Sequence, residues 1–538
     1  MELNLQQQQL VALPVGNVLV IAPAGCGKTE ALAARAQAVL KREEVPSPKK
    51  ILALTFSNKA RDNLSRRMRI AIGGGWRQRV WVTNLHGLSG RLIHAHGATV
   101  GVAPDIAFPE EPWRRRIRAE LGITWANRNV DAFESALKNS KCGPFDDAEV
   151  MQRLQDYGCR PAIAYEERLR EEGRLDYDDM LRHGSRILSV AGVARLYRAH
   201  FGMTLVDEVQ DLTVMQYEMV SAIGGDTVTY AGDPAQGIYT FAGADPLEVF
   251  SRIRGLDPEV VEFNQSYRSA PAVVRVVNAL AAEMGSTELF CATPERWPDE
   301  GQVISLERSN RSEEAAALVT LIEELTTDPA TTVGVVGRVG TRSQHLRSLA
   351  QGRGLEFEDW ALPTHVPAIV NLLKDCISQA ASGAVDDAAA LERLGELCRA
   401  RIESADAETL NELASALDAI GKLVEDGATV EDAVRSCRSS SAPGEPVIPG
   451  LHVLTGHKGK GQEFDWVVIV GLENGHIPAW QSKTDDEIAE ELRVLHVMVS
   501  RARYGLVLTL ARHDGRYPTA PSRWLELLRA NATRYDHV

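Results

Sequence analysis

The 538-residue sequence is poor in cysteine, and its few cysteines are scattered. There are seven of them, at positions 26, 142, 159, 291, 376, 398 and 437, with no Cys-x-x-Cys pair. An odd, dispersed set of this kind argues against a disulfide framework and against a four-cysteine zinc or iron–sulfur site. We therefore look for function in other residue types.

Long apolar runs and a signal peptide are also missing. No apolar stretch approaches the roughly 20 residues that are needed to span a bilayer. The N-terminal segment MELNLQQQQL lacks a basic region followed by an apolar one, which is the pattern of a secretory signal. We expect a cytoplasmic protein without a membrane partner.

Positive charge is in deficit over the whole chain. The 59 Lys and Arg residues face 73 Asp and Glu residues, which gives a net charge of −14. This balance disfavours a protein that coats nucleic acid without specificity, although it leaves room for a local basic surface. With 44% apolar residues, a chain of this length is expected to form several globular domains.

Strand-like apolar runs alternate with helix-like segments in two parts of the chain. The runs are residues 17–21, 51–54, 80–82, 204–206 and 228–230 in the first part, and 303–306, 333–336, 452–454, 466–470 and 505–510 in the second. Such alternation is typical of parallel α/β sheets. Helical periodicity replaces it between about residues 88 and 200, and again from about 361 to 440. The simplest prediction is two α/β domains, each carrying a helical insertion.

The segment APAGCGKT (22–29) follows the first strand-like run and opens directly into a helix-like segment. In such a loop, successive backbone N–H groups wrap a triphosphate, Lys28 faces its outer phosphates and Thr29 offers a hydroxyl to Mg²⁺. Ala22 stands where the general pattern has its first glycine, but the strand, the helix and the intact GKT favour a phosphate loop over a chance turn. The residues predicted to line the nucleotide here are Ala24, Gly25, Cys26, Gly27, Lys28 and Thr29.

A second strand-like run ends in two carboxylates, as the other half of an ATPase site requires. Leu205 and Val206 are followed by Asp207 and Glu208. Asp207 is predicted to hold Mg²⁺, and Glu208 to polarise the attacking water. The sequence thus predicts an enzyme that hydrolyses ATP with Mg²⁺.

Eight motifs, one of which contains Asp207 and Glu208, occur in order along nearly the whole chain. They are LNLQQ (3–7), LTFSNKARDNL (54–64), TNLHG (83–87), VDEVQD (206–211), AGDPAQGIYTFAGA (231–244), NQSYRS (264–269), TGHKGKGQEF (455–464) and LHVMVSRAR (495–503). This order resembles that of the UvrD/Rep-like superfamily 1 DNA helicases, and PSRW (521–524) lies where that family often ends. The resemblance implies two RecA-like domains and a DNA-dependent ATPase.

The resemblance also implies a division of the chain. The first RecA-like domain would comprise residues 1–87 and 190–268, interrupted by a helical insertion at 88–189. The second would comprise residues 269–360 and 441–538, interrupted by a short helical insertion at 361–440.

Roles at the nucleotide follow from the same resemblance. The residues implied are Gln7, Tyr267 and Glu463 at the nucleoside, and Gln236, Arg268 and Arg501 at the γ-phosphate. The family places the two arginines on the second domain, opposite Lys28. ATP would therefore close a cleft, and reopening after hydrolysis would drive movement along DNA.

A local basic segment is the candidate DNA track. Residues 58–96 contain eight Lys or Arg residues and one acidic residue, a pattern suited to single-stranded nucleic acid, although a solvated surface is the alternative. By resemblance, the DNA contacts are Phe56, Asn58, His86, Tyr239, Phe241 and His457. The family often has Trp at position 241 and Arg at 242, where this chain has Phe241 and Ala242, so stacking is kept and a polar contact is lost.

Three hypotheses about function remain open. The insertion at 361–440 contains fourteen acidic and seven basic residues, so we expect it not to grip duplex DNA, and little chain after PSRW is left for a nuclease domain. The first hypothesis is a 3′→5′ helicase acting on single-stranded DNA and single-strand/duplex junctions. The second is a translocase with little unwinding. The third is an ATP-gated subunit of a nuclease complex, such as the UvrD-like subunit of Gabija-type antiphage systems, and a repair protein is another candidate partner.

Overall fold

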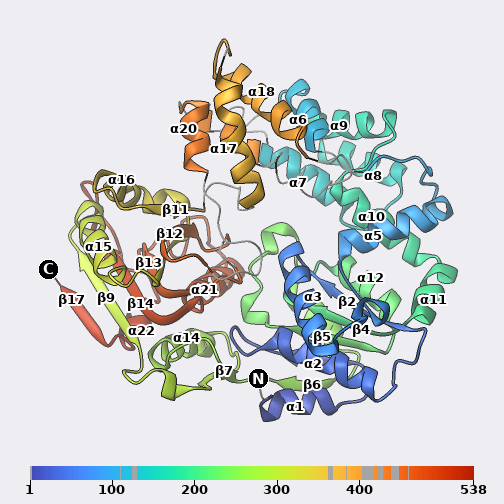
Figure 1. Ribbon diagram of the computed structural model, residues 1–538, viewed down its shortest axis with the longest axis horizontal. Helices are drawn as coiled ribbons and strands as arrows, with labels where there is room; N and C mark the ends of the chain where they lie inside the picture. Colours follow the sequence, from blue (N-terminus) through green and yellow to red (C-terminus); the bar gives the residue numbers. More distant parts are fainter. Residues whose placement is uncertain are drawn as a thin grey trace.

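The computed structural model contains two parallel α/β sheets, as the sequence predicts (Figure 1). It describes residues 3–108, 111–123, 130–360, 367–382, 384–402, 428–437, 447–458 and 460–537, together with 413, 416, 417, 419–421, 423 and 424. The α/β class with two RecA-like domains is confirmed.

The first sheet has six parallel strands in the order β3-β2-β4-β5-β1-β6. They are β1 Val18–Ile21, β2 Lys50–Thr55, β3 Val80–Asn84, β4 Phe201–Asp207, β5 Val228–Gly232 and β6 Glu259–Glu262. Its accompanying helices are α1 Leu5–Ala12, α2 Lys28–Lys41, α3 Asn58–Ile72, α4 Trp76–Arg79, α12 Val214–Gly224 and α13 Pro246–Arg254. Since β1 and β4 both pair with β5, their carboxyl ends meet at one edge, where α/β sheets bind ligands.

The second sheet has seven parallel strands in the order β11-β12-β10-β13-β14-β9-β17. They are β9 Gln302–Arg308, β10 Thr332–Gly337, β11 Phe357–Asp359, β12 Gly450–Thr455, β13 Phe464–Val470, β14 Ala502–Ala511 and β17 Arg534–His537. Its helices are α14 Pro271–Glu283, α15 Arg311–Leu325, α16 Gln344–Gly352, α21 Asp485–Val499 and α22 Leu525–Arg529. Short strand pairs join β7 Gln265–Ser266 to β8 Phe290–Cys291, and β15 His513–Asp514 to β16 Tyr517–Pro518.

Apolar packing continues from one α/β domain into the other. A single cluster of buried residues includes Val20 of β1, Phe263 of the connecting segment, Val273 of α14 and Ile469 of β13. The connecting segment therefore packs against both domains, and the edge that carries the phosphate loop faces the second domain.

Helices occupy the first insertion. They are α5 Leu85–His96, α6 Glu111–Glu120, α7 Val130–Lys141, α8 Asp147–Tyr157, α9 Arg160–Glu171, α10 Tyr177–Ser189 and α11 Ala191–His200. Helices α6 to α9 share a core around Phe133 and Tyr165. In contrast, Leu88 of α5 and Leu181 of α10 belong to the core beneath the first sheet, so these two helices attach the insertion to its domain.

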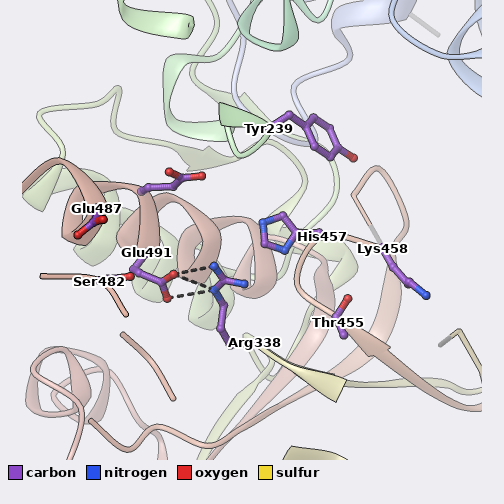
Figure 2. Close-up of a pocket in the computed structure, with 9 residues that line it drawn as sticks. Tyr239, Arg338, Thr455, His457, Lys458, Ser482, Glu487 and Glu491 are labelled. Carbon is purple, nitrogen blue, oxygen red and sulfur yellow. Dashed lines mark hydrogen bonds and ion pairs between the residues drawn. The ribbon is translucent and has the colours of Figure 1, made fainter. Parts of the chain in front are cut away.

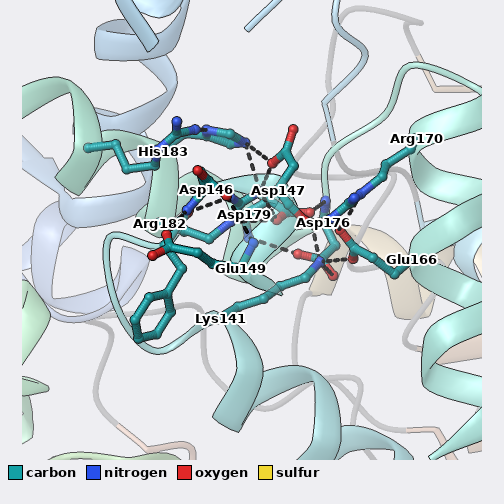
Figure 3. A network of polar contacts seen from close by, with 12 residues as sticks. Lys141, Asp146, Asp147, Glu149, Glu166, Arg170, Asp176, Asp179, Arg182 and His183 are labelled. Carbon is teal, nitrogen blue, oxygen red and sulfur yellow. Dashed lines mark hydrogen bonds and ion pairs between the residues drawn. The ribbon is translucent and has the colours of Figure 1, made fainter. Parts of the chain in front are cut away.

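A buried network of charges fastens α7 and α9 to the N-terminus of α10 (Figure 3). The ammonium of Lys141 lies 2.7 Å from Glu166, 2.8 Å from Asp176 and 2.8 Å from Asp179. Arg182 also lies 2.8 Å from Asp179. Burial disfavours the charge on Lys141, but the three carboxylates outweigh it and raise its pKa. Removing Lys141 would take the shared cation away from Glu166 and Asp176, and breaking a buried ion pair in this way costs about 3–5 kcal/mol.

The second insertion has a core of its own. Its described helices are α17 Pro367–Ala381, α18 Asp387–Arg399 and α20 Val430–Ser436. Leu373, Cys376, Leu394, Cys398 and Val434 are buried together there, in a cluster separate from those of the sheets. None of the helices in the described part of the chain has the length and apolar character needed to cross a membrane.

Candidate functional site

The phosphate loop lies between β1 and α2 and contacts two other predicted site residues. Gly25 and Gly27 have φ angles of 82° and 74°, which favour glycine. A Cβ at Gly25 would lie 2.6 Å from the Cβ of Arg268, and one at Gly27 would lie 2.7 Å from Nε2 of Gln7. Both glycines are therefore required by backbone conformation and by space.

Gln7 and Tyr267, both predicted at the base, are joined through Asn4. Gln7 is fully buried, and its Nε2 donates to the carbonyl of Cys26 at 3.1 Å. Asn4 caps α1, accepting from the Gln7 backbone at 2.8 Å, and its Nδ2 donates to the Tyr267 hydroxyl at 3.0 Å. Asn4 was not predicted, although the Asn-x-x-Gln spacing of a capping box was visible in the sequence.

Lys28 is held by the two carboxylates at the end of β4. Its Nζ lies 2.8 Å from Oε1 of Glu208 and 3.4 Å from Oδ1 of Asp207. Burial opposes the charge on Lys28, but Glu208 and then Asp207 outweigh it and raise its pKa. Thr29 donates from its hydroxyl to Oδ2 of Asp207 at 3.4 Å. The residues that the sequence predicts to contact the phosphates, the metal ion and the attacking water therefore lie within contact distance of one another.

Glu208 combines an unusual backbone with an unusual acidity. Its φ of 60° is rare for a residue with a Cβ, and such outliers concentrate at functional sites. Burial alone would raise the pKa of Glu208, but Lys28, followed by Lys460, lowers it to about 2. Burial, in turn, raises the pKa of Asp207 despite the attraction of Lys28. The two carboxylates are thereby given different proton affinities.

The second domain supplies an arginine whose charge is incompletely paired. Arg501 is 1% exposed, and its Nη2 donates to the carbonyl of Gly456. Among the described residues, its Nε and Nη1 have no hydrogen-bond partner. Burial lowers the pKa of Arg501 to about 9. Because buried donors are nearly always paired, this guanidinium fits an anion such as a phosphate.

Arg268 lies beside the phosphate loop, in the segment that joins the two domains. Its Nε and Nη2 lie 2.9 Å and 2.8 Å from Oε1 of Glu463, and its Nη1 donates to the carbonyl of Ser500 at 3.0 Å. Glu463, predicted at the ribose, thus holds one of the two predicted γ-phosphate arginines. Gln236 lies on the first domain, where its Nε2 donates to Asp233 at 2.8 Å.

Two of the predicted DNA contacts stack on each other. The rings of Phe56 and Tyr239 have centroids 5.6 Å apart and an interplanar angle of 16°. Asn58 accepts a hydrogen bond from Asn84 at 2.7 Å. The side chain of Phe241 lies outside the described residues.

His86 is the remaining predicted DNA contact on the first domain. It packs edge-on against Tyr177 with ring centroids 5.9 Å apart, and burial lowers its pKa. Arg66, Arg69 and Arg77 of the basic segment are exposed, so part of this segment faces solvent.

A cavity of about 720 Å³ brings Tyr239 and His457 together (Figure 2). Its lining residues are Tyr239, Arg338, Thr455, His457, Lys458, Ser482, Glu487, Glu490 and Glu491. Burial, followed by Arg338, lowers the pKa of His457 to about 4. Arg338 binds Glu491 of α21 through a fork of hydrogen bonds at 2.7–3.1 Å. Predicted DNA contacts from both domains thus line one hollow.

Sequence reasoning missed a contact between the domains. Nζ of Lys460 lies 2.6 Å and 2.8 Å from the two carboxylate oxygens of Asp211 and 2.8 Å from the carbonyl of Gln236. Both residues stand in recognisable motifs, as the last acid of DEVQD and as the lysine between glycines in GKG. Only the fold reveals that they meet.

Comparison with known proteins yields two family models and a set of relatives. The UvrD/REP helicase N-terminal domain matches residues 3–254, and the UvrD-like helicase C-terminal domain matches residues 365–513. The chain is 28% identical to ATP-dependent DNA helicase UvrD2 of Mycobacterium tuberculosis, over 99% of this chain and 82% of the relative. It is 26% identical to DNA helicase II of Escherichia coli K12, over 95% of this chain and 84% of the relative.

Proposed function

Because the chain belongs to the UvrD/Rep-like superfamily 1 helicases and is an ATP-dependent DNA helicase, we propose that it moves 3′→5′ along single-stranded DNA and unwinds junctions. The motor would be ATP hydrolysis between the two α/β domains. The observation that carries this proposal is the buried guanidinium of Arg501, two of whose nitrogens have no hydrogen-bond partner among the described residues. Polarity rests on the family resemblance.

Nucleotide binding would exchange the partners of Lys28. Its ammonium pairs with Glu208 and Asp207, and the outer phosphates of ATP would offer more negative charge at the same place. When Lys28 turns to them, Glu208 is freed to orient the attacking water. Gln7 and Tyr267 would hold the base at the end of the loop where Asn4 joins them.

A magnesium ion suits the oxygen donors at the end of β4. The Thr29 hydroxyl and the Asp207 carboxylate lie next to each other, and Mg²⁺ prefers oxygen ligands, with phosphates and water completing its shell. Among the described residues, no group of three or more His, Cys, Asp or Glu is arranged to hold a metal alone. The bound ion would neutralise phosphate charge during transfer.

Hydrolysis would be completed by Arg501 of the second domain and by Arg268 of the segment that joins the domains. Arg501 and Arg268 would stabilise the charge that spreads over the transferring phosphoryl group, an effect of order 10³–10⁵ in related enzymes. Drawing Arg501 toward the phosphate would close the domains. On the DNA side, closure would move His457 relative to Tyr239 around the 720 Å³ cavity, and a base there would be carried along.

Forked duplexes with a 3′ or a 5′ single-stranded tail test this proposal directly. We expect ATPase activity that rises with single-stranded DNA, and unwinding of the 3′-tailed fork only. A blunt duplex serves as the control substrate. Unwinding that starts from the 5′ tail would refute the polarity, and hydrolysis indifferent to DNA would refute the motor.

A subunit of a nuclease complex is the second candidate. It is favoured by the acidic insertion at 361–440, whose described helices have a separate core and can present charge to a basic protein. This alternative predicts DNA-stimulated ATPase without unwinding, and recovery of a nuclease when the tagged chain is purified from its native cells. A translocase with little unwinding would also show DNA-stimulated ATPase without unwinding, but no nuclease would be recovered with it.

A further inference from the structure

Lys460 crosses from the second domain to the first. It lies on the loop between β12 and β13, yet all of its close polar contacts given above, to Asp211 and to the Gln236 carbonyl, are on the first domain. Its side chain is 11% exposed. A buried ammonium shared between a carboxylate and a carbonyl has few alternative positions, because leaving them costs its pairing.

The partners of Lys460 belong to a hydrogen-bonded frame around the hydrolysis residues. Asp211 follows Gln210, whose Nε2 donates to the carboxylate of Glu208. The Oε1 of Gln210 accepts from the backbone of Asp233 at 3.1 Å. Asp233 in turn accepts from the Gln236 side chain. Movement of Lys460 would therefore shift both Glu208, proposed to orient the water, and Gln236, proposed to contact the γ-phosphate.

The same ammonium touches the aromatic pair on the DNA side. Nζ of Lys460 lies 4.8 Å from the centroid of the Tyr239 ring, within cation–π range. Tyr239 is also the ring that stacks on Phe56. A base that stacks on Tyr239 would compete with these neighbours for the ring or shift the ring itself. Either event changes the surroundings of Lys460.

We infer that Lys460 is the positioning residue through which a base at Tyr239 sets the rate of ATP hydrolysis. The inference rests on the proposed function, and it assigns the coupling between DNA binding and ATP hydrolysis to one side chain. In the structure, Lys460 is shared by Asp211, the Gln236 carbonyl and the Tyr239 ring. When a base binds at Tyr239, Lys460 loses its contact with the ring and keeps those with Asp211 and the Gln236 carbonyl. The hydrogen-bonded residues that hold Glu208 are then fixed in position.

A plain bridge between domains is the competing explanation, and the chain offers a matched control for it. Arg493 of α21 also crosses the cleft, where its Nε donates to the carbonyl of Gly237 at 3.1 Å, next to the carbonyl that Lys460 uses. Arg493→Ala removes one interdomain hydrogen bond from a cation without touching Tyr239 or Asp211. A merely structural role predicts that Lys460→Met and Arg493→Ala behave alike.

The test measures kcat with and without a saturating oligothymidylate in the full-length chain. We expect Lys460→Met to lower the ratio of stimulated to basal kcat at least tenfold, while Arg493→Ala keeps the wild-type ratio. Lys460→Arg, which retains the cation, should recover part of it. Asp211→Asn should lower the ratio as well, and adding Lys460→Met to it should cause little further loss, because the two residues act as one unit.

A binding experiment separates positioning from activity. In wild type, a non-hydrolysable ATP analogue should change the Kd for the oligonucleotide, and linkage requires DNA to change nucleotide affinity by the same factor. In Lys460→Met that factor should approach one. If wild type is stimulated and Lys460→Met is stimulated equally, the inference is wrong. If wild type itself ignores DNA, the proposed function fails instead. If Lys460→Met does not fold, the ratio of stimulated to basal kcat in Asp211→Asn tests the inference instead: a wild-type ratio would contradict it.

Discussion

The two sides of the proposed nucleotide cleft hold their positive charges in opposite ways. On the first domain, carboxylates outweigh burial and raise the pKa of Lys28. On the second, burial outweighs its partners and lowers the pKa of Arg501 to about 9. The charge on the first side is balanced by carboxylates of the same domain, whereas the second side holds a desolvated cation with two nitrogens that have no hydrogen-bond partner among the described residues. The difference suggests that Lys28 serves binding and Arg501 serves the transition state.

Loss of Lys28 should produce the largest effect. In Lys28→Ala we expect ATP hydrolysis to be abolished, because the phosphates lose their charge partner and Asp207 and Glu208 are left to repel each other. Single-strand affinity without nucleotide should stay within a few-fold, since the predicted DNA contacts exclude Lys28. Steady-state ATPase and oligonucleotide binding measure the two effects.

Lys41→Ala is the matched control for Lys28→Ala. Lys41 ends the same helix, α2, and is exposed. It should hydrolyse ATP like wild type. If Lys28→Ala hydrolyses ATP near the wild-type rate, Lys28 does not bind the phosphates, and the proposed difference between the two sides is wrong.

Loss of Arg501 should be smaller and different in kind. We expect Arg501→Ala to lower kcat by about 10²-fold or more with nearly unchanged KM, because its contribution appears as charge develops on the phosphoryl group. The Tm should not fall as it does for most buried truncations, since an incompletely paired buried charge is removed. Kinetics and thermal melting test both parts.

Arg503→Ala provides the control for Arg501→Ala, because Arg503 lies two residues away on β14 and pairs with Asp465 at 3.2 Å. It should leave kcat unchanged. If Arg501→Ala raises KM at normal kcat, Arg501 is a ground-state ligand like Lys28, and the two sides of the cleft do not differ as the pKa directions suggest.

Most of the fold could be predicted from the sequence because buried parallel strands appear as continuous apolar runs. Within the two large sheets, the three strands that escaped prediction, β6, β11 and β17, lie at sheet edges, where pairing on one side needs less apolar surface. The motif order located Lys28 and Asp207 as neighbours. It did not predict the contact of Lys460 with Asp211, 249 residues away, because such pairings depend on how whole domains pack.

The loss of stability at low pH should show how burial controls the charge of a side chain in the second domain. His452 lies on β12, where its Nδ1 accepts from Trp360 Nε1 at 3.1 Å and its Nε2 lies 2.8 Å from the carbonyl of Ile448. Protonation would place a second N–H against the Trp360 donor. Burial, with that single backbone bond opposing it, lowers the pKa of His452 to about 4.

The folded protein is then stabilised by neutral His452 above the pKa of the unfolded chain, about 6.5, and this contribution is lost as the pH falls toward 4. Between pH 7 and 5 the loss is about 2 kcal/mol, or a few degrees in the Tm of the second domain. His452→Gln, which keeps a donor and an acceptor, should melt with a correspondingly smaller drop over this range. His345→Gln, at an exposed position, should keep the wild-type drop. Equal drops in wild type and His452→Gln would mean that burial at this histidine does not govern its charge.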